Sequence, residues 1–325
     1  MMKSKPSLAV ILVHDQRAGH LNPSLGVYDC LETAYTTTLD KVETPSIKKW
    51  QISLLKKLSW YPHLFDFCSA IFFKNFQSKQ NIDCILCSGM PNLLYGIFVS
   101  RRLKIPLFYA GDLRKVNEQL VNCTITALPQ NIQAQQVVLA TPPVKKEFIN
   151  LQQDQLDQTT ALLILGGPTD EHPFAYNDFE KIIDKFIALC TQNQLKGLIT
   201  NSRRTPDLDR YFQKTNIPEN IQLHLVQTKN ALSLVQLIQQ ATYIFVTEDS
   251  TSMLAEAIQS GRFISSIYTP KSVFEALNKK YLAEGLMSRQ ALNETFSLPQ
   301  QRNLAKLNLS RPLIAAIQHH LDAHP

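Results

Sequence analysis

Three loops in the second half of the chain carry residue types that bind a diphosphate. Each follows an apolar run typical of a buried strand. They contain Gly166, Gly167 and Thr169; Ser202, Arg203 and Arg204; and Ser250, Thr251 and Ser252, which follow Glu248 and Asp249. Arginine can donate two hydrogen bonds to phosphate oxygens, and the first turn of a helix expected from 251 offers free amides to an anion. Each loop alone also fits a helix cap, a solvated turn or a glycine turn. Together they favour an anion site.

A different loop follows the apolar run 8–13 in the first half of the chain. It holds two histidines and an acid, His14, Asp15 and His20, before a helix expected to begin near Pro23. A histidine can act as a general base because its reference pKa, about 6.5, lies near working pH. A single histidine more often has a structural role. We rank His20 first as the candidate base, then Asp15 and His14, with Asp112 below them.

Strands and helices must position these loops, and the sequence predicts both from its alternation of apolar runs and helical patterns. Ten short runs rich in Ile, Leu and Val predict strands, at 8–13, 83–88, 105–110, 123–127, 136–140, 161–165, 195–200, 222–226, 243–246 and 263–267. Helical patterns between them, such as 178–192, 231–240, 251–260 and 271–283, are typical of parallel βαβ units. The carboxyl ends of parallel strands share one sheet edge, so the loops of each half gather there.

The chain of 325 residues is long enough for two domains. Prolines 142 and 143 and the polar stretch 151–160 place the boundary, which predicts one domain of residues 1–150 and a second domain of residues 151–325. The fold class is α/β, with two Rossmann-like domains facing one another across a cleft. The last helix, 312–321, is expected to pack back near the linker.

The quoted loops together resemble a known family. VTEDSTSMLAEAIQSG, SRRTP, ILGGPT and AGHLNPSLG are similar to the bacterial relatives of the plant mitochondrial fission factor, which are regarded as glycosyltransferases of the GT-B fold. The first loop and the serine-rich helix start also resemble the lipid-linked N-acetylglucosaminyltransferases of peptidoglycan synthesis. The resemblance implies that Glu256 binds the donor ribose, that the turn at 250–252 binds the diphosphate, and that His20 or Asp15 lies near the acceptor.

The expected activity is hexosyl or N-acetylhexosaminyl transfer from a nucleotide-diphosphate sugar to a surface-glycan acceptor, either lipooligosaccharide, as in lipopolysaccharide core biosynthesis, or lipid-linked. No cofactor is expected, and the absence of a DxD strand-end pair favours a metal-independent enzyme. Arginines and a helix dipole would then neutralise the leaving diphosphate. The chain departs from the peptidoglycan enzymes in its first loop, where Gln16 and Arg17 replace small residues. The acids Glu248 and Asp249 either orient Arg203 or Arg204 or bind a sugar hydroxyl.

The amino-acid composition limits the kinds of partner and the cellular location that we expect for this protein. The chain is 44% hydrophobic with a formal charge of +6, and no run of eighteen apolar residues is present, so a transmembrane helix and a signal peptide are not expected. Cys84 and Cys87 are expected to be buried thiols rather than a metal pair. We therefore expect a cytoplasmic protein. Residues 47–60 put Ile47, Trp50, Leu54 and Leu58 at helical spacing among lysines, typical either of peripheral contact with an anionic inner membrane or of a docked surface helix.

Other functions remain as alternatives. A non-enzymatic adaptor with the GT-B shape, as the plant relative is thought to be, would recruit a membrane-remodelling partner through the tryptophan surface. A nucleotide-sugar epimerase is a weaker option because the first strand is not followed by GxGxxG. Nucleic-acid binding is not expected because the lysines are scattered or confined to one amphipathic stretch.

Overall fold

The computed structural model describes residues 5–73, 76, 81–149, 151 and 159–322. The chain forms two compact units. The first contains residues Met1–Lys146 and Asn308–Pro325, and the second contains Glu147–Leu307. The boundary therefore lies close to the predicted one at 150. Most of the predicted linker, 151–160, lies outside the described residues.

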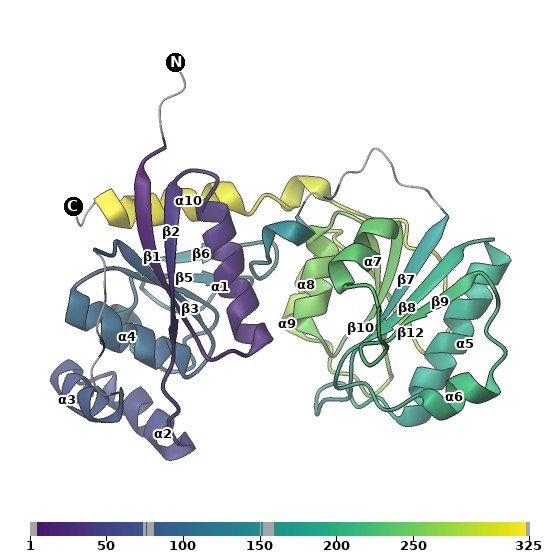
Figure 1. The fold of residues 1–325 in the computed structure, drawn as a ribbon, viewed down its shortest axis with the longest axis horizontal. Helices are drawn as coiled ribbons and strands as arrows, with labels where there is room; N and C mark the ends of the chain where they lie inside the picture. The colour runs from purple at the N-terminus through teal and green to yellow at the C-terminus, as the bar shows by residue number, and fades with distance from the viewer. Residues whose placement is uncertain (1–4, 74–75, 77–80, 150, 152–158, 323–325) are drawn as a thin grey trace. The chain divides into compact units, whose positions relative to one another are not determined.

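The first unit is built on a six-stranded parallel sheet with the order β2-β1-β3-β4-β5-β6 (Figure 1). The strands are β1 (Ser7–His14), β2 (Thr36–Glu43), β3 (Cys84–Ser88), β4 (Leu107–Ala110), β5 (Cys123–Thr126) and β6 (Gln136–Val138). The helices are α1 (Ala18–Leu31), α2 (Lys49–Leu58), α3 (Pro62–Phe73), α4 (Asn92–Leu103) and α10 (Ser310–Asp322), with a short 3-10 turn at Glu118–Leu120. Another 3-10 turn, Lys146–Phe148, spans the boundary to the second unit.

Helices cover both faces of this sheet because alternate strand residues are apolar on each side. Ile11, Ile85 and Cys87 pack with residues of α3 and α4, and Val10 and Cys84 pack with α1 and α10. Cys84 and Cys87 thus lie on opposite faces, and burial raises the pKa of both thiols. Their expected role as buried free thiols is confirmed.

The last helix, α10, belongs to the first unit. Leu309, Leu313 and Ile317 are buried in the apolar cluster that includes Val27 and Leu31 of α1. The second unit therefore ends at Leu307, whereas the sequence assigned everything to 325 to it. The difference has a physical cause, because the apolar face of α10 is complementary to α1, β5 and β6.

The second unit also contains a six-stranded parallel sheet, with the order β12-β11-β10-β7-β8-β9. Its strands are β7 (Thr160–Leu165), β8 (Lys196–Asn201), β9 (Ile221–His224), β10 (Tyr243–Thr247), β11 (Phe263–Tyr268) and β12 (Ser288–Ala291). Its helices are α5 (Tyr176–Gln192), α6 (Asp209–Lys214), α7 (Leu234–Gln240), α8 (Thr251–Gln259) and α9 (Ala276–Ala283), with a 3-10 turn at Leu304–Lys306.

Every predicted apolar run overlaps one of these strands, whereas β2 and β12 were not predicted. The order of the second sheet places β7 between β10 and β8, so the polar loops after these three strands emerge side by side. The topology alone therefore brings the three predicted anion-binding loops to one edge of this sheet.

Candidate functional site

Asp249 joins the three predicted anion-binding loops of the second unit. Its Oδ2 accepts a hydrogen bond from the Gly167 amide at 2.8 Å and one from Arg204 Nη2 at 3.0 Å. Thr247 Oγ1 also accepts the Gly166 amide at 2.7 Å. The ends of β7, β8 and β10 are thereby fixed to one another. Of the two roles left open for Asp249, this contact corresponds to orientation of Arg204.

The two glycines allow the loops to approach this closely. A Cβ on Gly166 would lie 2.0 Å from Asp249 Oδ2, and one on Gly167 would lie 2.3 Å from the Arg204 carbonyl oxygen. Neither distance is compatible with a side chain. The glycine pair is therefore required by packing between loops, independently of any contact with a phosphate.

Ser202 and Thr205 fix the arginine-bearing loop to the end of β7. The Ser202 amide donates to the Leu165 carbonyl at 2.8 Å, and Thr205 Oγ1 donates to the same carbonyl at 3.0 Å. Ser202 Oγ accepts the Arg204 amide at 3.1 Å. Arg203 is exposed at this fixed turn. Arg204 is also exposed, with 49% of its side chain accessible, but its bond to Asp249 orients it.

Helix α8 begins beside these loops with its first-turn amides unused by a side-chain cap. Ser250 is the N-cap residue, but its hydroxyl makes no capping bond, contrary to the predicted cap. Its φ of −116° and ψ of 91° place the residue in the extended region. Thr251 and Ser252 are exposed in the first turn, whereas Glu256 is buried one turn later. The helix start therefore retains the amides that an anion would use.

Glu248 has a partner that the sequence did not suggest. Its two carboxylate oxygens accept from Arg289 Nε at 2.6 Å and Arg289 Nη2 at 2.9 Å, and Ser266 Oγ donates at 2.8 Å. The Arg289 guanidinium also lies 3.6 Å from the ring centroid of Tyr268 and 4.3 Å from that of Phe274. Glu248 is therefore paired with a cation on the β11–β12 side, and not with Arg203 or Arg204 as one of its two expected roles required.

The Asp249 carboxyl group has a perturbed pKa. Burial raises the pKa of Asp249, and the hydrogen bonds and the Arg204 charge around it offset only part of this effect. Its Oδ1 is buried and has no hydrogen-bond partner. Such a perturbed carboxyl group at the junction of three loops is typical of a functional site.

A cavity of about 300 Å³ lies against the same loops. Its wall contains Ile164, Thr200, Asn201, His224, Ser233 and Met253, among others, so it borders the ends of β7, β8 and β9 and the first turn of α8. His224 Nδ1 accepts the Leu232 amide at 3.4 Å, which leaves the proton on Nε2, and Nε2 is buried without a partner. Burial, together with the Lys196 charge, lowers the pKa of His224. The sequence did not reveal this cavity, because its lining comes from four separate segments.

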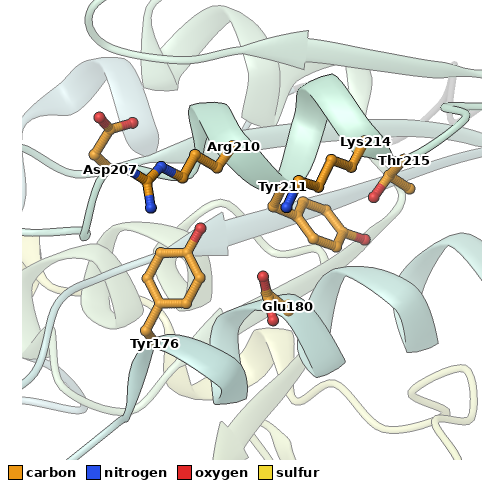
Figure 2. Close-up of a pocket in the computed structure, with 7 residues that line it drawn as sticks. All are labelled: Tyr176, Glu180, Asp207, Arg210, Tyr211, Lys214 and Thr215. Atoms are coloured by element: carbon orange, nitrogen blue, oxygen red, sulfur yellow. The ribbon is translucent and has the colours of Figure 1, made fainter.

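A second cavity, of about 590 Å³, lies between α5 and α6 (Figure 2). Its lining residues are Tyr176, Glu180, Asp207, Arg210, Tyr211, Lys214 and Thr215, whose side chains surround a shared space. Tyr211 also donates to Asp184 at 2.6 Å. None of the predicted site residues lines this cavity.

The first unit holds the acid–histidine pair. His20 Nδ1 lies 3.0 Å and 3.1 Å from the two Asp15 oxygens, and Arg17 Nε donates to Asp15 Oδ2 at 2.7 Å. Burial would raise the pKa of Asp15, but hydrogen bonds and positive charge from Arg17 and His20 lower it below its usual value. The carboxylate therefore orients the imidazole through Nδ1.

Helix α1 begins earlier than the sequence predicted. It starts at Ala18, so His20 lies in its first turn and not in a loop before Pro23. The amides of His20 and Leu21 both donate to the Arg17 carbonyl at 2.9 Å, which closes the turn ahead of the proline. Gly89, at φ 75°, admits the imidazole, because a Cβ there would lie 2.2 Å from its ring.

Two predicted site residues have local roles. His14 ends β1, and its Nδ1 accepts the Gln16 amide at 3.3 Å. Thr169 and His172 form a closed turn, in which the Thr169 amide donates to the His172 carbonyl and Thr169 Oγ1 accepts the His172 amide, both at 3.0 Å. These contacts occupy His14 Nδ1 and Thr169 Oγ1 as hydrogen-bond acceptors.

Comparison with known proteins places this arrangement in a family. The sequence profile described as mitochondrial fission ELM1 matches residues 118–306, more than half of the chain, and the chain belongs to that family. A curated relative, the uncharacterized protein RP120 of Rickettsia prowazekii, is 25% identical over 173 residues. That match covers 50% of this chain and 47% of RP120, so the chain spans about half the length of this relative.

Solved structures share the fold over nearly the whole chain. MurG of Acinetobacter baumannii has a TM-score of 0.51 and 17% identity, covering 97% of this chain and 98% of its own. A UDP-GlcNAc 2-epimerase of Methanocaldococcus jannaschii has a TM-score of 0.54 and 13% identity, with coverage of 97% and 93%. The predicted fold class is confirmed, since the chain has two parallel-sheet units and the GT-B architecture.

Proposed function

We propose that this protein is a glycosyltransferase that uses a nucleotide-diphosphate sugar. The observation that carries the proposal is the junction of three loops in the second unit, where Asp249 holds Gly167 and Arg204 beside the uncapped start of α8. Cationic and amide donors fixed at one sheet edge suit the negative charge that develops on a departing diphosphate. These contacts favour an anionic ligand independently of the likeness to solved structures.

The donor would lie across the loop junction and the neighbouring cavity. The nucleobase would enter the cavity of about 300 Å³, where the Nε2–H of His224 can donate to a base carbonyl. The diphosphate would accept hydrogen bonds from the first-turn amides of α8 and from Arg203, and Glu256 would bind the ribose. In this arrangement the protein's own donors stabilise the leaving group, which makes the proposed reaction metal-independent.

The first unit would supply the base. The acceptor hydroxyl oxygen forms a bond to the anomeric carbon of the sugar, the bond from that carbon to the diphosphate breaks, and His20 Nε2 takes the hydroxyl proton. Asp15 stabilises the resulting imidazolium, since it already faces Nδ1 at 3.0 Å. We propose a surface-glycan or lipid-linked acceptor.

Titration calorimetry with a panel of nucleoside diphosphates tests the donor site. Arg203→Met should weaken binding by about 10- to 100-fold, because a hydrogen bond to a charged group contributes about 1.5–3 kcal/mol. Arg210→Met is the matched control, since Arg210 is an exposed arginine of the same unit that lines the other cavity. Failure of every nucleotide to bind, or equal binding by both variants, would overturn the donor site.

Turnover separates the proposed enzyme from its rivals. Release of nucleoside diphosphate should require an acceptor, and His20→Ala should lower kcat by about 100-fold or more while donor affinity is unchanged. An epimerase would instead convert the donor sugar without acceptor. Absence of GxGxxG does not exclude that reaction, because UDP-GlcNAc 2-epimerases share this fold. Nucleotide binding without any turnover would favour the adaptor.

A further inference from the structure

Helices α2 and α3 form a hairpin whose outer face is apolar. Trp60, Leu64, Phe67 and Ile71 recur at helical spacing and are all exposed, Leu64 at 53% and Phe67 at 67%. On the other side of α3, Phe65 and Phe73 are buried in the core. A helix that is apolar on both sides needs a second apolar environment for its outer face. The sequence predicted either a membrane contact or a docked surface helix at residues 47–60, but the exposed apolar stripe runs mainly along α3.

Cations border this stripe. Lys49 and Lys57 are exposed on α2, and Arg114 and Lys115 are exposed on the loop that follows β4. Trp60 Nε1 donates to the Lys115 carbonyl at 3.3 Å, so this basic loop lies directly beside the stripe. Asp66 of α3 is paired with a cation, since its oxygens accept from Arg101 at 2.6 Å and 2.7 Å, and Asp112 accepts the Arg114 amide at 2.8 Å.

The hairpin is fixed to the edge of the sheet that carries the Asp15–His20 pair. The Asn117 amide donates to Ser59 Oγ at 2.9 Å, and Asn117 Nδ2 donates to the Ser59 carbonyl at 3.2 Å, which ties the hairpin turn to the segment after β4. Asp15 and His20 follow β1, and β1, β3 and β4 are parallel neighbours. The apolar stripe therefore belongs to the carboxyl edge of the first sheet.

We infer that this hairpin docks the first unit onto an anionic lipid bilayer, with Leu64, Phe67 and Ile71 inserted among the acyl chains. Trp60 and Tyr61 then lie at the headgroup level, and Lys49, Lys57, Arg114 and Lys115 meet the lipid phosphates. An apolar stripe bordered by cations matches the layers of such a bilayer, whereas a protein partner would have to supply a matching acidic rim. Within the described residues, no helix is long and apolar enough to cross a membrane, so the contact is peripheral. If the proposed function holds, the acceptor is membrane-bound, because the docked surface and His20 belong to the same edge of the first sheet.

Tryptophan fluorescence of the full chain reports this contact directly, because Trp50 and Trp60 are its only tryptophans and both belong to the hairpin region. Addition of vesicles containing phosphatidylglycerol should shift the emission to the blue, and brominated acyl chains should quench it. Phosphatidylcholine vesicles should have a much smaller effect. Unchanged emission with the anionic vesicles would overturn the inference.

Vesicle co-sedimentation with paired variants identifies the surface. The combined change Leu64→Ser, Phe67→Ser and Ile71→Ser should reduce binding at least tenfold, with unchanged circular dichroism because the three side chains are exposed. The control changes Val138→Ser, Val273→Ser and Leu304→Ser remove three exposed apolar side chains elsewhere and should leave binding intact.

The cations that border the stripe are tested by a separate pair of substitutions. Arg114→Gln with Lys115→Gln should weaken binding about fivefold for each charge removed and reduce its salt dependence. Equal binding by the apolar variant and its control would overturn the inference, as would self-association through this face without vesicle binding. Vesicle binding needs no sugar donor, so this test can fail while the nucleotide titration succeeds, or the reverse.

Discussion

Glu248 and Asp249 can lie beside the proposed anion site because each carboxylate is paired with an arginine of its own. Glu248 is paired with Arg289 and accepts a hydrogen bond from Ser266, and Asp249 is paired with Arg204 and accepts one from the Gly167 amide. The side chains of both acids are inaccessible to solvent, and Arg289 is largely enclosed as well. The free energy of each pair therefore depends on keeping both partners, because a charge left alone in this environment cannot be hydrated.

Removal of Arg289 alone should destabilise the second unit. Arg289→Met leaves Glu248 buried without its cation, at a cost of about 3–5 kcal/mol in the free energy of unfolding. The double variant Glu248→Gln with Arg289→Met should recover a large part of that loss. Hydrogen exchange resolved by unit measures both. Equal destabilisation by the single and double variants would show that the charge pairing has little energetic weight.

The raised pKa of Asp249 predicts a dependence of stability on pH. The folded protein binds this proton more tightly than the unfolded chain, so stability falls as pH rises from the unfolded value, about 3.8, through the folded pKa, and the loss is complete above it. Asp249→Asn removes this titration and keeps an acceptor for the Gly167 amide. The melting temperature of the variant relative to wild type should therefore rise between pH 4 and pH 7. A constant difference would contradict the prediction.

At the scale of elements, close packing of helix α1 determines where His20 lies. Gly26 faces the segment before the second unit, and a Cβ there would lie 2.5 Å from the Val144 carbonyl oxygen. Gly19 directly precedes His20 on the same helix, and a Cβ at Gly19 would meet no other atom within 4 Å. The two glycines thus differ in environment although they share one helix.

Gly26→Ala should displace α1 and destabilise the first unit by about 1–3 kcal/mol, because backbone atoms cannot yield as a side chain would. Gly19→Ala should be neutral or stabilise by about 0.5–1 kcal/mol, since alanine favours the helix. Denaturant unfolding of the two variants in parallel measures the contrast. Comparable losses in both would mean that helix propensity, and not the Val144 contact, controls this element.

The elements also show how far sequence reasoning extends. Runs such as 161–165 predict strands because buried parallel strands are continuously apolar, and β7 confirms this. Strand β2 was missed because TTTLDKVE is largely exposed, and β12 because SRQA has no apolar run. Since β12 carries Arg289, the partner of Glu248 was missed with it. A pair separated by 41 residues becomes visible only once the strand order is known.

At the scale of the whole chain, the two units are not two successive halves. The chain leaves the first unit after Lys146, builds the second, and returns at Asn308 to complete the first with α10. The sequence predicted that the last helix packs back near the linker, but the linear boundary at 150 left this helix in the second unit. Its partner surface is formed some 280 residues earlier, where Ser310 Oγ contacts Cys30 Sγ at 3.5 Å.

This return predicts that damage to the last helix unfolds the opposite end of the sequence. Leu313→Ala with Ile317→Ala removes two fully buried side chains from the cluster shared with Val27 and Leu31, each at about 2–5 kcal/mol. Hydrogen exchange should increase in β1, β5 and α1 while 159–307 stays protected, and nucleotide affinity should persist because the donor loops belong to the second unit. Gln318→Ala, exposed on the same helix, is the control. Loss of protection confined to 159–307 would instead assign α10 to the second unit.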